Sequence, residues 1–314
     1  MPVEFFTHNV NGFERNQYFV RDTCISLPHC VYGLQEHWLR PPSKRKPGVN
    51  ALMSLHPDLD GWGTSAMKAS MGEKILTGRP YGGTGFIWTK QLSSSIKPRS
   101  DYRHERVTVL EIKSSIGSLL LINCYLPYYN VNDIASQTDK YIDTIAFIDT
   151  VIRDNPNSSY IVMGDFNCNI YDRSNEFTEL LKGFVRDHNL LCTYDFMPSF
   201  DAKTNFTRFN LKQNSFSLLD YVFISSELKE LIIDTNIVDS CPTTSDHYPV
   251  RLLLSVDLED KSIPSKSPPR VINWRKVTGD TRKLYEKVME EYLDSIQIPY
   301  LVHGNVACNS ADHA

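Results

Sequence analysis

Acidic and amide side chains follow several short apolar runs of this sequence, where a strand would place them at the edge of a sheet. The run Ile161–Met163 ends in Gly164, which would let the backbone turn sharply before Asp165 and Asn167. These two side chains stand two residues apart and are expected to project from the same side. The carboxylate could take a proton from water or hold a metal, and the amide could donate to a phosphoryl oxygen.

Glu36 follows a second apolar run, Val31–Leu34, in a similar way. A carboxylate there is a hard oxygen ligand suited to Mg²⁺, which takes one or two protein carboxylates and keeps several waters. An ordinary glutamate at the start of a helix is the alternative. Asn9 and Asn11 also point one way from a strand end, although an Asx turn is the better interpretation of that motif when it is taken alone.

The adjacent residues Asp246 and His247 stand just before the last apolar run. An imidazole has an ordinary pKa near ~6.5, so His247 suits proton transfer or donation to a phosphate at neutral pH. Asp220, a lone carboxylate inside an apolar run, is a candidate partner, because an Asp behind a His fixes its tautomer and supports its charged form. Taken alone, Asp220 could equally be a core aspartate bound by backbone donors.

Together these residues place amides, carboxylates and one histidine at strand ends of a β-rich chain. That inventory suits metal-assisted hydrolysis of a phosphoester. The sequence lacks the Gly-x-Ser-x-Gly of serine hydrolases and the Walker pattern of nucleotide triphosphatases, so neither chemistry is expected.

Short runs rich in β-branched, aliphatic and aromatic residues predict the strands that must position this site. They are Val3–Asn9, Val31–Gln35, Thr84–Trp88, Val107–Ile112, Leu119–Tyr125, Tyr160–Met163, Leu218–Ile224 and Val250–Val256. Apolar residues at helical spacing predict helices at Gln137–Arg153 and Glu176–Asn189. We therefore expect an α/β protein in which two packed mixed β-sheets are flanked by helices.

The 314 residues are 22% charged and 41% hydrophobic, which is the composition of an ordinary globular protein. The formal net charge is -4, but between Arg40 and Lys113 lysine and arginine outnumber aspartate and glutamate by 13 to 6. Such a basic segment could anchor a phosphate backbone, and it could equally be a solvated face that serves solubility.

The seven cysteines are unclustered, so we expect reduced thiols in an intracellular protein, nuclear or cytoplasmic. No run reaches the roughly 20 apolar residues of a membrane-spanning helix, and the N-terminus lacks the pattern of a secretory signal. We therefore expect neither a membrane association nor secretion.

The sequence predicts one domain over residues 1–257, followed by a linker rich in Pro, Ser and Lys at 258–272. Residues 273–314 are expected to form a C-terminal helix, with apolar residues at helical spacing over Thr281–Ile298, and a frayed tail.

Six short motifs share their order with a known family. They are Asn9-Val10-Asn11-Gly12, Gln35-Glu36, Asn123-Cys124-Tyr125-Leu126-Pro127, Gly164-Asp165-Phe166-Asn167, Leu219-Asp220-Tyr221 and Ser245-Asp246-His247. In this order they resemble the endonuclease/exonuclease/phosphatase superfamily, which includes DNase I, exonuclease III and the apurinic endonucleases. The run Arg79–Trp88 is similar to the endonuclease domains of non-LTR (LINE-type) retrotransposons, and the stretch around Trp274 resembles what those elements carry before their reverse transcriptase. The resemblance implies a four-layer α/β sandwich of the DNase I type.

The resemblance also implies a divalent cation, Mg²⁺ with Mn²⁺ as a substitute. Glu36 and Asn11 would ligate it, and Asp246 would contribute. Many members have Asp where Asn11 stands, but an amide oxygen can still coordinate Mg²⁺. Asp165 would orient or deprotonate the attacking water.

The remaining roles implied by the resemblance concern the phosphate. Asn167 and Asn9 would hydrogen-bond it, and Tyr125 would contact it or help the leaving group. His247, braced by Asp220, would stabilise the charge of the pentacovalent transition state.

Our leading hypothesis from the sequence is a Mg²⁺-dependent endonuclease that nicks DNA, with Arg79 and Arg106 among the residues that bind the backbone. We expect a monomer, with a reverse transcriptase domain as a partner in a longer parent polyprotein. The alternatives are a phosphatase or phospholipase-type phosphodiesterase of the same fold, acting on inositol phosphates or sphingomyelin, and an inactive remnant that only binds.

Overall fold

The computed structural model describes residues 1–44, 46–66, 80–172, 175–258, 283, 286 and 287. The chain divides into two compact units, Met1–Lys261 and Ser262–Ala314, and every strand and helix named below belongs to the first. The predicted linker at 258–272 and the predicted helix and tail at 273–314 lie almost entirely outside the described residues. Within the described part, no helix combines the length and the apolar character needed to span a bilayer.

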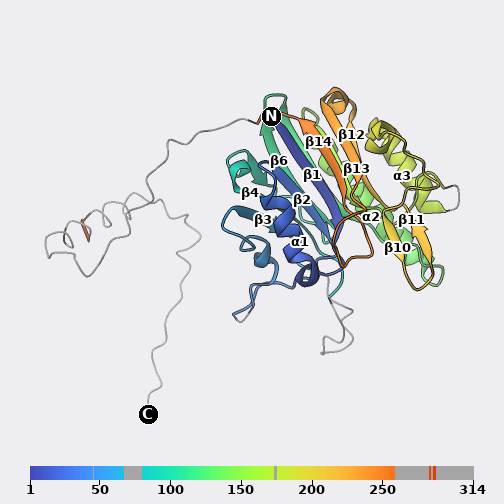
Figure 1. Cartoon of the computed structure of the whole chain (residues 1–314), viewed down its shortest axis with the longest axis horizontal. Helices are drawn as coiled ribbons and strands as arrows, with labels where there is room; N and C mark the ends of the chain where they lie inside the picture. Colours follow the sequence, from blue (N-terminus) through green and yellow to red (C-terminus); the bar gives the residue numbers. More distant parts are fainter. Residues whose placement is uncertain (45, 67–79, 173–174, 259–282, 284–285, 288–314) are drawn as a thin grey trace, which may run out of the picture. The chain divides into compact units, whose positions relative to one another are not determined.

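Two six-stranded mixed sheets build the first unit (Figure 1). The first sheet has the order β13-β14-β1-β2-β4-β3, formed by Ile232–Ile237, Val250–Ser255, Pro2–Asn9, Cys30–Gln35, Thr84–Thr89 and Leu59–Gly63. The second has the order β5-β6-β7-β8-β12-β9, formed by Ile96–Pro98, Val107–Ser114, Gly117–Tyr125, Ser159–Asp165, Asp220–Ser225 and Leu190–Cys192. A separate hairpin pairs β10 (Arg208–Asn210) with β11 (Ser215–Ser217).

Among the described residues three α-helices flank the sheets, namely α1 (Phe13–Ile25), α2 (Ile134–Arg153) and α3 (Glu176–Asp187). Side chains alternate along β1, so that Phe5 lies in the core between the sheets while Phe6 packs on the outer face with Phe13 of α1. Tyr141 of α2 and Phe177 of α3 stack at 4.2 Å and are buried with the second sheet. These layers confirm the predicted α/β sandwich.

Helix α1 was absent from the sequence prediction because its buried face is not uniformly apolar. Among its buried residues is Asn16, whose Nδ2 donates to the Val10 carbonyl at 2.7 Å and whose Oδ1 accepts from the backbone N–H of Thr244 at 2.8 Å. A polar residue at the centre of the stripe hides the helical period.

Each sheet contains one parallel pair of strands, β1–β2 in the first and β7–β8 in the second. The C-terminal ends of both pairs lie at one edge of the sandwich. A hydrogen bond across the two sheets shows this, in which Asn9 Nδ2 donates to Asp165 Oδ2 at 2.9 Å. The first residue of β12, Asp220, pairs in register with Asp165 at that same edge. The fold therefore gathers the predicted strand ends in one place.

Candidate active site

The strand ends open into a cleft of about 620 Å³. It is lined by Asn11, Glu36, Tyr81, Arg106, Tyr125, Pro127, Tyr128, Gln137, Lys140, Asp165, Asn167, Arg208, Asp246 and His247. Asn9 and Asp220 are buried beneath this lining and hydrogen-bond to it. The structure thus brings together every predicted site residue except Arg79, which lies outside the described residues.

The turns that follow β1 and β8 have the same local geometry. Asn9 Oδ1 accepts from the backbone N–H of Asn11 at 3.1 Å, and Asp165 Oδ1 accepts from that of Asn167 at 2.9 Å. Both are Asx turns, and each leaves its second asparagine in left-handed backbone, with φ of 44° and 51°. The Asx turn considered for the first motif is therefore present, while Asn9 Nδ2 still bonds to Asp165 and Glu36.

Strand β8 continues through Gly164 to Asp165, so the sharp turn predicted at this glycine is wrong. A Cβ on Gly164 would lie only 1.9 Å from the carbonyl oxygen of Cys124 on β7, and its φ is 150°. Glycine here permits the close approach of two parallel strands. That approach sets Asp165 beside Tyr125 in register.

His247 is buried between two carboxylates that are cross-strand neighbours. Its Nδ1 lies 2.8 Å from Asp220 Oδ2, and its Nε2 lies 4.0 Å from Asp165 Oδ2. Burial lowers the pKa of His247, but the charges of Asp220, Asp165 and Asp246 outweigh it and raise the pKa to about 9. The imidazole is therefore protonated at neutral pH, and its Nε2–H faces the cleft.

The pKa of Asp165 is also raised, which for a carboxyl group favours the neutral form. Burial and the charge of Asp220 raise its pKa to about 7, against the attraction of His247 and the hydrogen bonds from Asn9 and Asn167. A carboxyl with this pKa exchanges its proton near neutral pH, as a general base must.

Glu36 lies in the loop after β2, so the alternative of a helix-start glutamate is wrong. Its backbone has φ 51°, its Oε1 accepts from Asn9 Nδ2 at 3.2 Å, and its Oε2 accepts from Trp38 Nε1 at 3.2 Å. Burial and the charges of Glu36 and Asp165 raise the pKa of Tyr125. The Tyr125 hydroxyl therefore keeps its proton and can donate into the cleft.

Asp246 is held by two donors. Asn11 Nδ2 donates to its Oδ1 at 2.8 Å, and Arg208 Nε donates to its Oδ2 at 3.0 Å. Although partial burial alone would raise the pKa of Asp246, the charge of His247 and the bond from Arg208 lower it. Asp246 is consequently a carboxylate throughout the neutral range.

The donor set on the Glu36 side fits Mg²⁺. Glu36 and Asp246 offer carboxylate oxygens, and the Asn11 amide, whose nitrogen faces Asp246, has its oxygen left for a cation. Ligand atoms of Asp165, Asp220 and His247 also lie within 4.8 Å of one another. Because His247 Nδ1 is bonded to Asp220 and the ring is protonated, that group suits proton transfer better than metal binding.

Besides the charged His247, the described lining of the cleft contains three cations, of which Arg106 was predicted from the sequence. Arg106 is buried, its guanidinium lies 5.5 Å from the centre of the Tyr125 ring, and its Nε has no hydrogen-bond partner among the described residues. Lys140 of α2 and Arg208 of the β10–β11 hairpin were missed. Within the described part of the basic segment Arg40–Lys113, Arg106 alone of the cations reaches this cleft.

The Asn123 side chain, part of a motif quoted from the sequence but given no role, connects the two sheets below the cleft. Its Nδ2 donates to the carbonyl oxygens of Leu34 on β2 and Gly85 on β4, each at 2.9 Å. Its Oδ1 accepts from Gln35 Nε2, next to Glu36. Asn123 therefore fixes the distance between the two halves of the site.

Solved structures with the same fold include several enzymes that act on phosphate esters. The AP endonuclease LMAP from Leishmania major is similar with a TM-score of 0.64 at 16% identity, covering 81% of this chain and 87% of its own. The 3′ phosphatase NExo from Neisseria, bound to a product DNA hairpin, has a TM-score of 0.60 at 16% identity, covering 81% and 99%. The endonuclease domain of TRAS1, a telomere-specific non-LTR retrotransposon, has a TM-score of 0.58 at 13% identity, covering 82% and 99%.

No curated protein matches the sequence. The model of the Endonuclease/Exonuclease/phosphatase family matches residues 6–247, a span that contains every residue lining the cleft. The chain therefore belongs to the endonuclease/exonuclease/phosphatase family of hydrolases.

Proposed function

We propose that this protein is a Mg²⁺-dependent endonuclease that hydrolyses phosphodiester bonds of DNA and leaves 3′-hydroxyl and 5′-phosphate ends. One observation carries the proposal: Asp165 faces the protonated His247–Asp220 pair in a cleft that also holds the oxygen donors of Glu36 and Asn11. That combination supplies a base, a cationic donor and a hard cation site around one scissile bond.

Asp165 orients the attacking water and takes its proton. Its two oxygens are fixed by the backbone N–H of Asn167 and by Asn9 Nδ2, so the carboxylate cannot rotate away. His247 donates from Nε2 to a non-bridging oxygen as negative charge develops there. Asp220 holds the other ring nitrogen and keeps the imidazole charged.

Asn167 and Tyr125 complete the phosphate contacts. One N–H of the Asn167 amide donates to the Leu126 carbonyl at 2.8 Å, which leaves the second N–H for a phosphoryl oxygen. The protonated Tyr125 hydroxyl donates to the phosphate or to the leaving oxygen. Glu36 and Asn11, with Asp246 alongside, would hold Mg²⁺ or Mn²⁺, which would supply positive charge to neutralise the phosphoryl oxygens.

Two observations support DNA as the substrate, namely the positive charge of the cleft and the similarity of the fold to enzymes that act on DNA. Arg106, Lys140 and Arg208 give the cleft the cations that a polyanionic backbone requires. NExo is bound to a DNA hairpin, and LMAP is an AP endonuclease. The likeness to the TRAS1 domain supports a reverse transcriptase as a partner domain, which the genomic sequence after the Ala314 codon would test.

Supercoiled plasmid DNA is the test substrate. With Mg²⁺ the protein should relax it, EDTA should prevent this, and Asp165→Ala or His247→Ala should abolish it. Asp149→Asn is the control, because it removes the negative charge from a His–Asp pair of the same 2.8 Å length, with His188, outside the cleft. Nicking that persists in both variants would remove these residues from the mechanism. Release of inorganic phosphate from an inositol phosphate without nicking would favour the phosphatase alternative, and inactivity in both assays would favour the binding remnant.

A further inference from the structure

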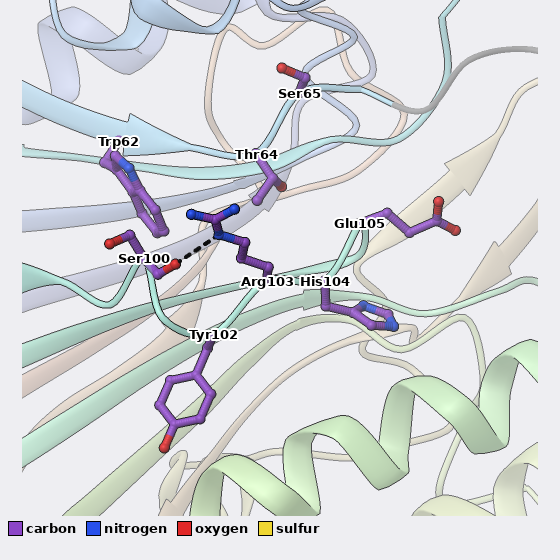
Figure 2. A pocket seen from close by; sticks show the side chains of 8 residues that line it. All are labelled: Trp62, Thr64, Ser65, Ser100, Tyr102, Arg103, His104 and Glu105. Atoms are coloured by element: carbon purple, nitrogen blue, oxygen red, sulfur yellow. Dashed lines mark hydrogen bonds between the residues drawn. The ribbon is translucent and has the colours of Figure 1, made fainter. Parts of the chain in front are cut away.

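A second pocket, of about 390 Å³, lies between the end of β3 and the segment that precedes β6 (Figure 2). It is lined by Trp62, Thr64, Ser65, Ser100, Tyr102, Arg103, His104 and Glu105. Nothing in the mechanism above uses these residues. The volume falls within the range of pockets that take small organic groups.

This pocket adjoins the catalytic cleft on two sides. His104, in its wall, accepts through Nδ1 from the backbone N–H of Arg106 at 3.1 Å, and Arg106 lines the cleft. Thr64, in the opposite wall, bonds through its carbonyl oxygen to His37 Nε2 at 2.9 Å, and His37 directly follows Glu36. The lining of the pocket is therefore hydrogen-bonded to Arg106, which lines the cleft, and to His37, the neighbour of Glu36.

The lining combines aromatic surface with one available cation. Trp62 and Tyr102 are half-buried, and the Arg103 guanidinium points toward the Trp62 indole (Figure 2). Arg103 is exposed, donates from Nε to the Ser100 carbonyl at 3.2 Å, and has no acidic partner among the described residues. The Glu105 carboxylate points away from it (Figure 2).

His104 is occupied elsewhere and is not counted as a second cation of the pocket. Its ring stacks on Phe147 at 4.8 Å, and its Nε2 lies 3.3 Å from Asp143. Hydroxyl groups of Ser65 and Ser100 also line the pocket and can bond to polar edges of a bound group, whereas the Thr64 hydroxyl is bonded to Thr84.

We propose that this pocket binds one unpaired nucleotide of the DNA substrate, with the base stacked on Trp62 and its phosphate paired with Arg103. An aromatic face beside a cation is how proteins hold single-stranded nucleic acid, since every base has a π-face and every nucleotide a charge. The inference rests on the proposed function, and it adds a preference for DNA that is locally unpaired beside the cut.

The test measures binding in EDTA, where no cleavage occurs. The probes are a fluorescein-labelled duplex with a central run of unpaired thymidines and the same duplex fully paired. Trp62→Ala should weaken binding of the unpaired probe by about 5- to 100-fold and leave the paired probe within about twofold, while Trp62→Phe should retain most of the affinity. Arg103→Ala should weaken binding of the unpaired probe and lower its salt dependence by about one counterion.

Tyr18→Ala and Arg186→Ala are matched controls, because both side chains are exposed on helices outside the two pockets. Wild-type affinity for both probes in Trp62→Ala and Arg103→Ala would overturn the inference, and so would an equal loss for the two probes in Trp62→Ala. Plasmid nicking separates the two proposals. If the wild type nicks plasmid but the Trp62 and Arg103 variants bind both probes as it does, only the pocket proposal is contradicted. If the wild type neither nicks plasmid nor binds DNA, both proposals are contradicted.

Discussion

Replacing Asp220 by asparagine isolates the charge that keeps His247 protonated. The two side chains have the same shape, so the substitution removes a negative charge 2.8 Å from Nδ1 while a hydrogen-bonding group remains there. The proposed mechanism requires Asp165 to be ionised and His247 to be charged in the wild type. The pKa values of about 7 and about 9 place that combination between these two limits.

The size of the effect follows from the pKa of His247. Its rise from 6.5 to about 9 corresponds to about 3 kcal/mol in favour of the imidazolium. Without the Asp220 charge, burial opposes the imidazolium with only Asp165 and Asp246 to offset it, so the pKa should fall. If it returned to the ordinary 6.5, the charged fraction at pH 8 would drop from about 90% to about 3%, a loss of about 30-fold in rate that is largely recovered near pH 6. The limb set by Asp165 also moves to lower pH, because Asp220 no longer raises its pKa.

The assay is the initial rate of plasmid nicking across the neutral and alkaline range, together with an NMR titration of the His247 ring. Asp149→Asn is the control, since it likewise removes a negative charge 2.8 Å from a histidine ring nitrogen, that of His188, without touching the cleft. An alkaline limb that stays in place, or a loss of rate that is equal at every pH, would refute the argument that Asp220 sets the charge of His247.

Three further predictions concern the bound Mg²⁺, the β7–β8 strand pair and the basic side chains of the cleft. Glu36→Gln should remove most of the rise in melting temperature that Mg²⁺ gives the wild type, and an equal rise by scanning fluorimetry would place the cation elsewhere. Gly164→Ala should lower the free energy of unfolding in urea by about 3 kcal/mol or more, because its methyl group would meet a β7 carbonyl oxygen at 1.9 Å. Gly117→Ala, with nothing within 4 Å, should lower it by about 1 kcal/mol, and equal losses would contradict the crowding argument. Lys140→Ala should weaken DNA binding and lower its salt dependence by about one counterion, whereas Arg153→Ala, 74% exposed on the same helix, should change neither in fluorescence anisotropy titrations.

The strand ends that carry the site could be located from the sequence because a buried strand has a recognisable local pattern. An apolar run is interrupted or followed by a polar residue that needs a partner, as at Glu36, Asp165 and Asp220. The contact between Asp220 and His247 could be expected from their chemistry, and the structure contains it at 2.8 Å. The layers followed from the same runs, since apolar strands bury their two faces by packing against another sheet or against helices.

Other parts of the site depend on contacts between distant segments, so no local sequence pattern predicts them. Arg208 reaches Asp246 because its hairpin pairs with the segment before β14, where the Phe209 N–H donates to the Asp246 carbonyl at 2.8 Å. Lys140 is one of several exposed polar residues on α2, and only the tertiary structure distinguishes it from the rest. The role of Gly164 likewise needs the neighbouring strand, because a glycine that turns a chain and a glycine that admits a carbonyl look alike in sequence.

Left-handed backbone at non-glycine residues is concentrated around the cleft, at Asn11, Glu36, Trp38 and Asn167. Each such residue costs about 1–3 kcal/mol and persists only where its surroundings fix it. At Glu36 the carbonyl accepts from the Gly12 N–H at 2.9 Å, and both carboxylate oxygens accept from side chains. A carboxylate fixed in this way already has its position before a cation or a phosphate arrives, so little conformational entropy remains to be lost on binding. The backbone strain at these four residues is therefore a consequence of holding the site rigid. It could not be predicted from the sequence, because none of these residue types requires a positive φ.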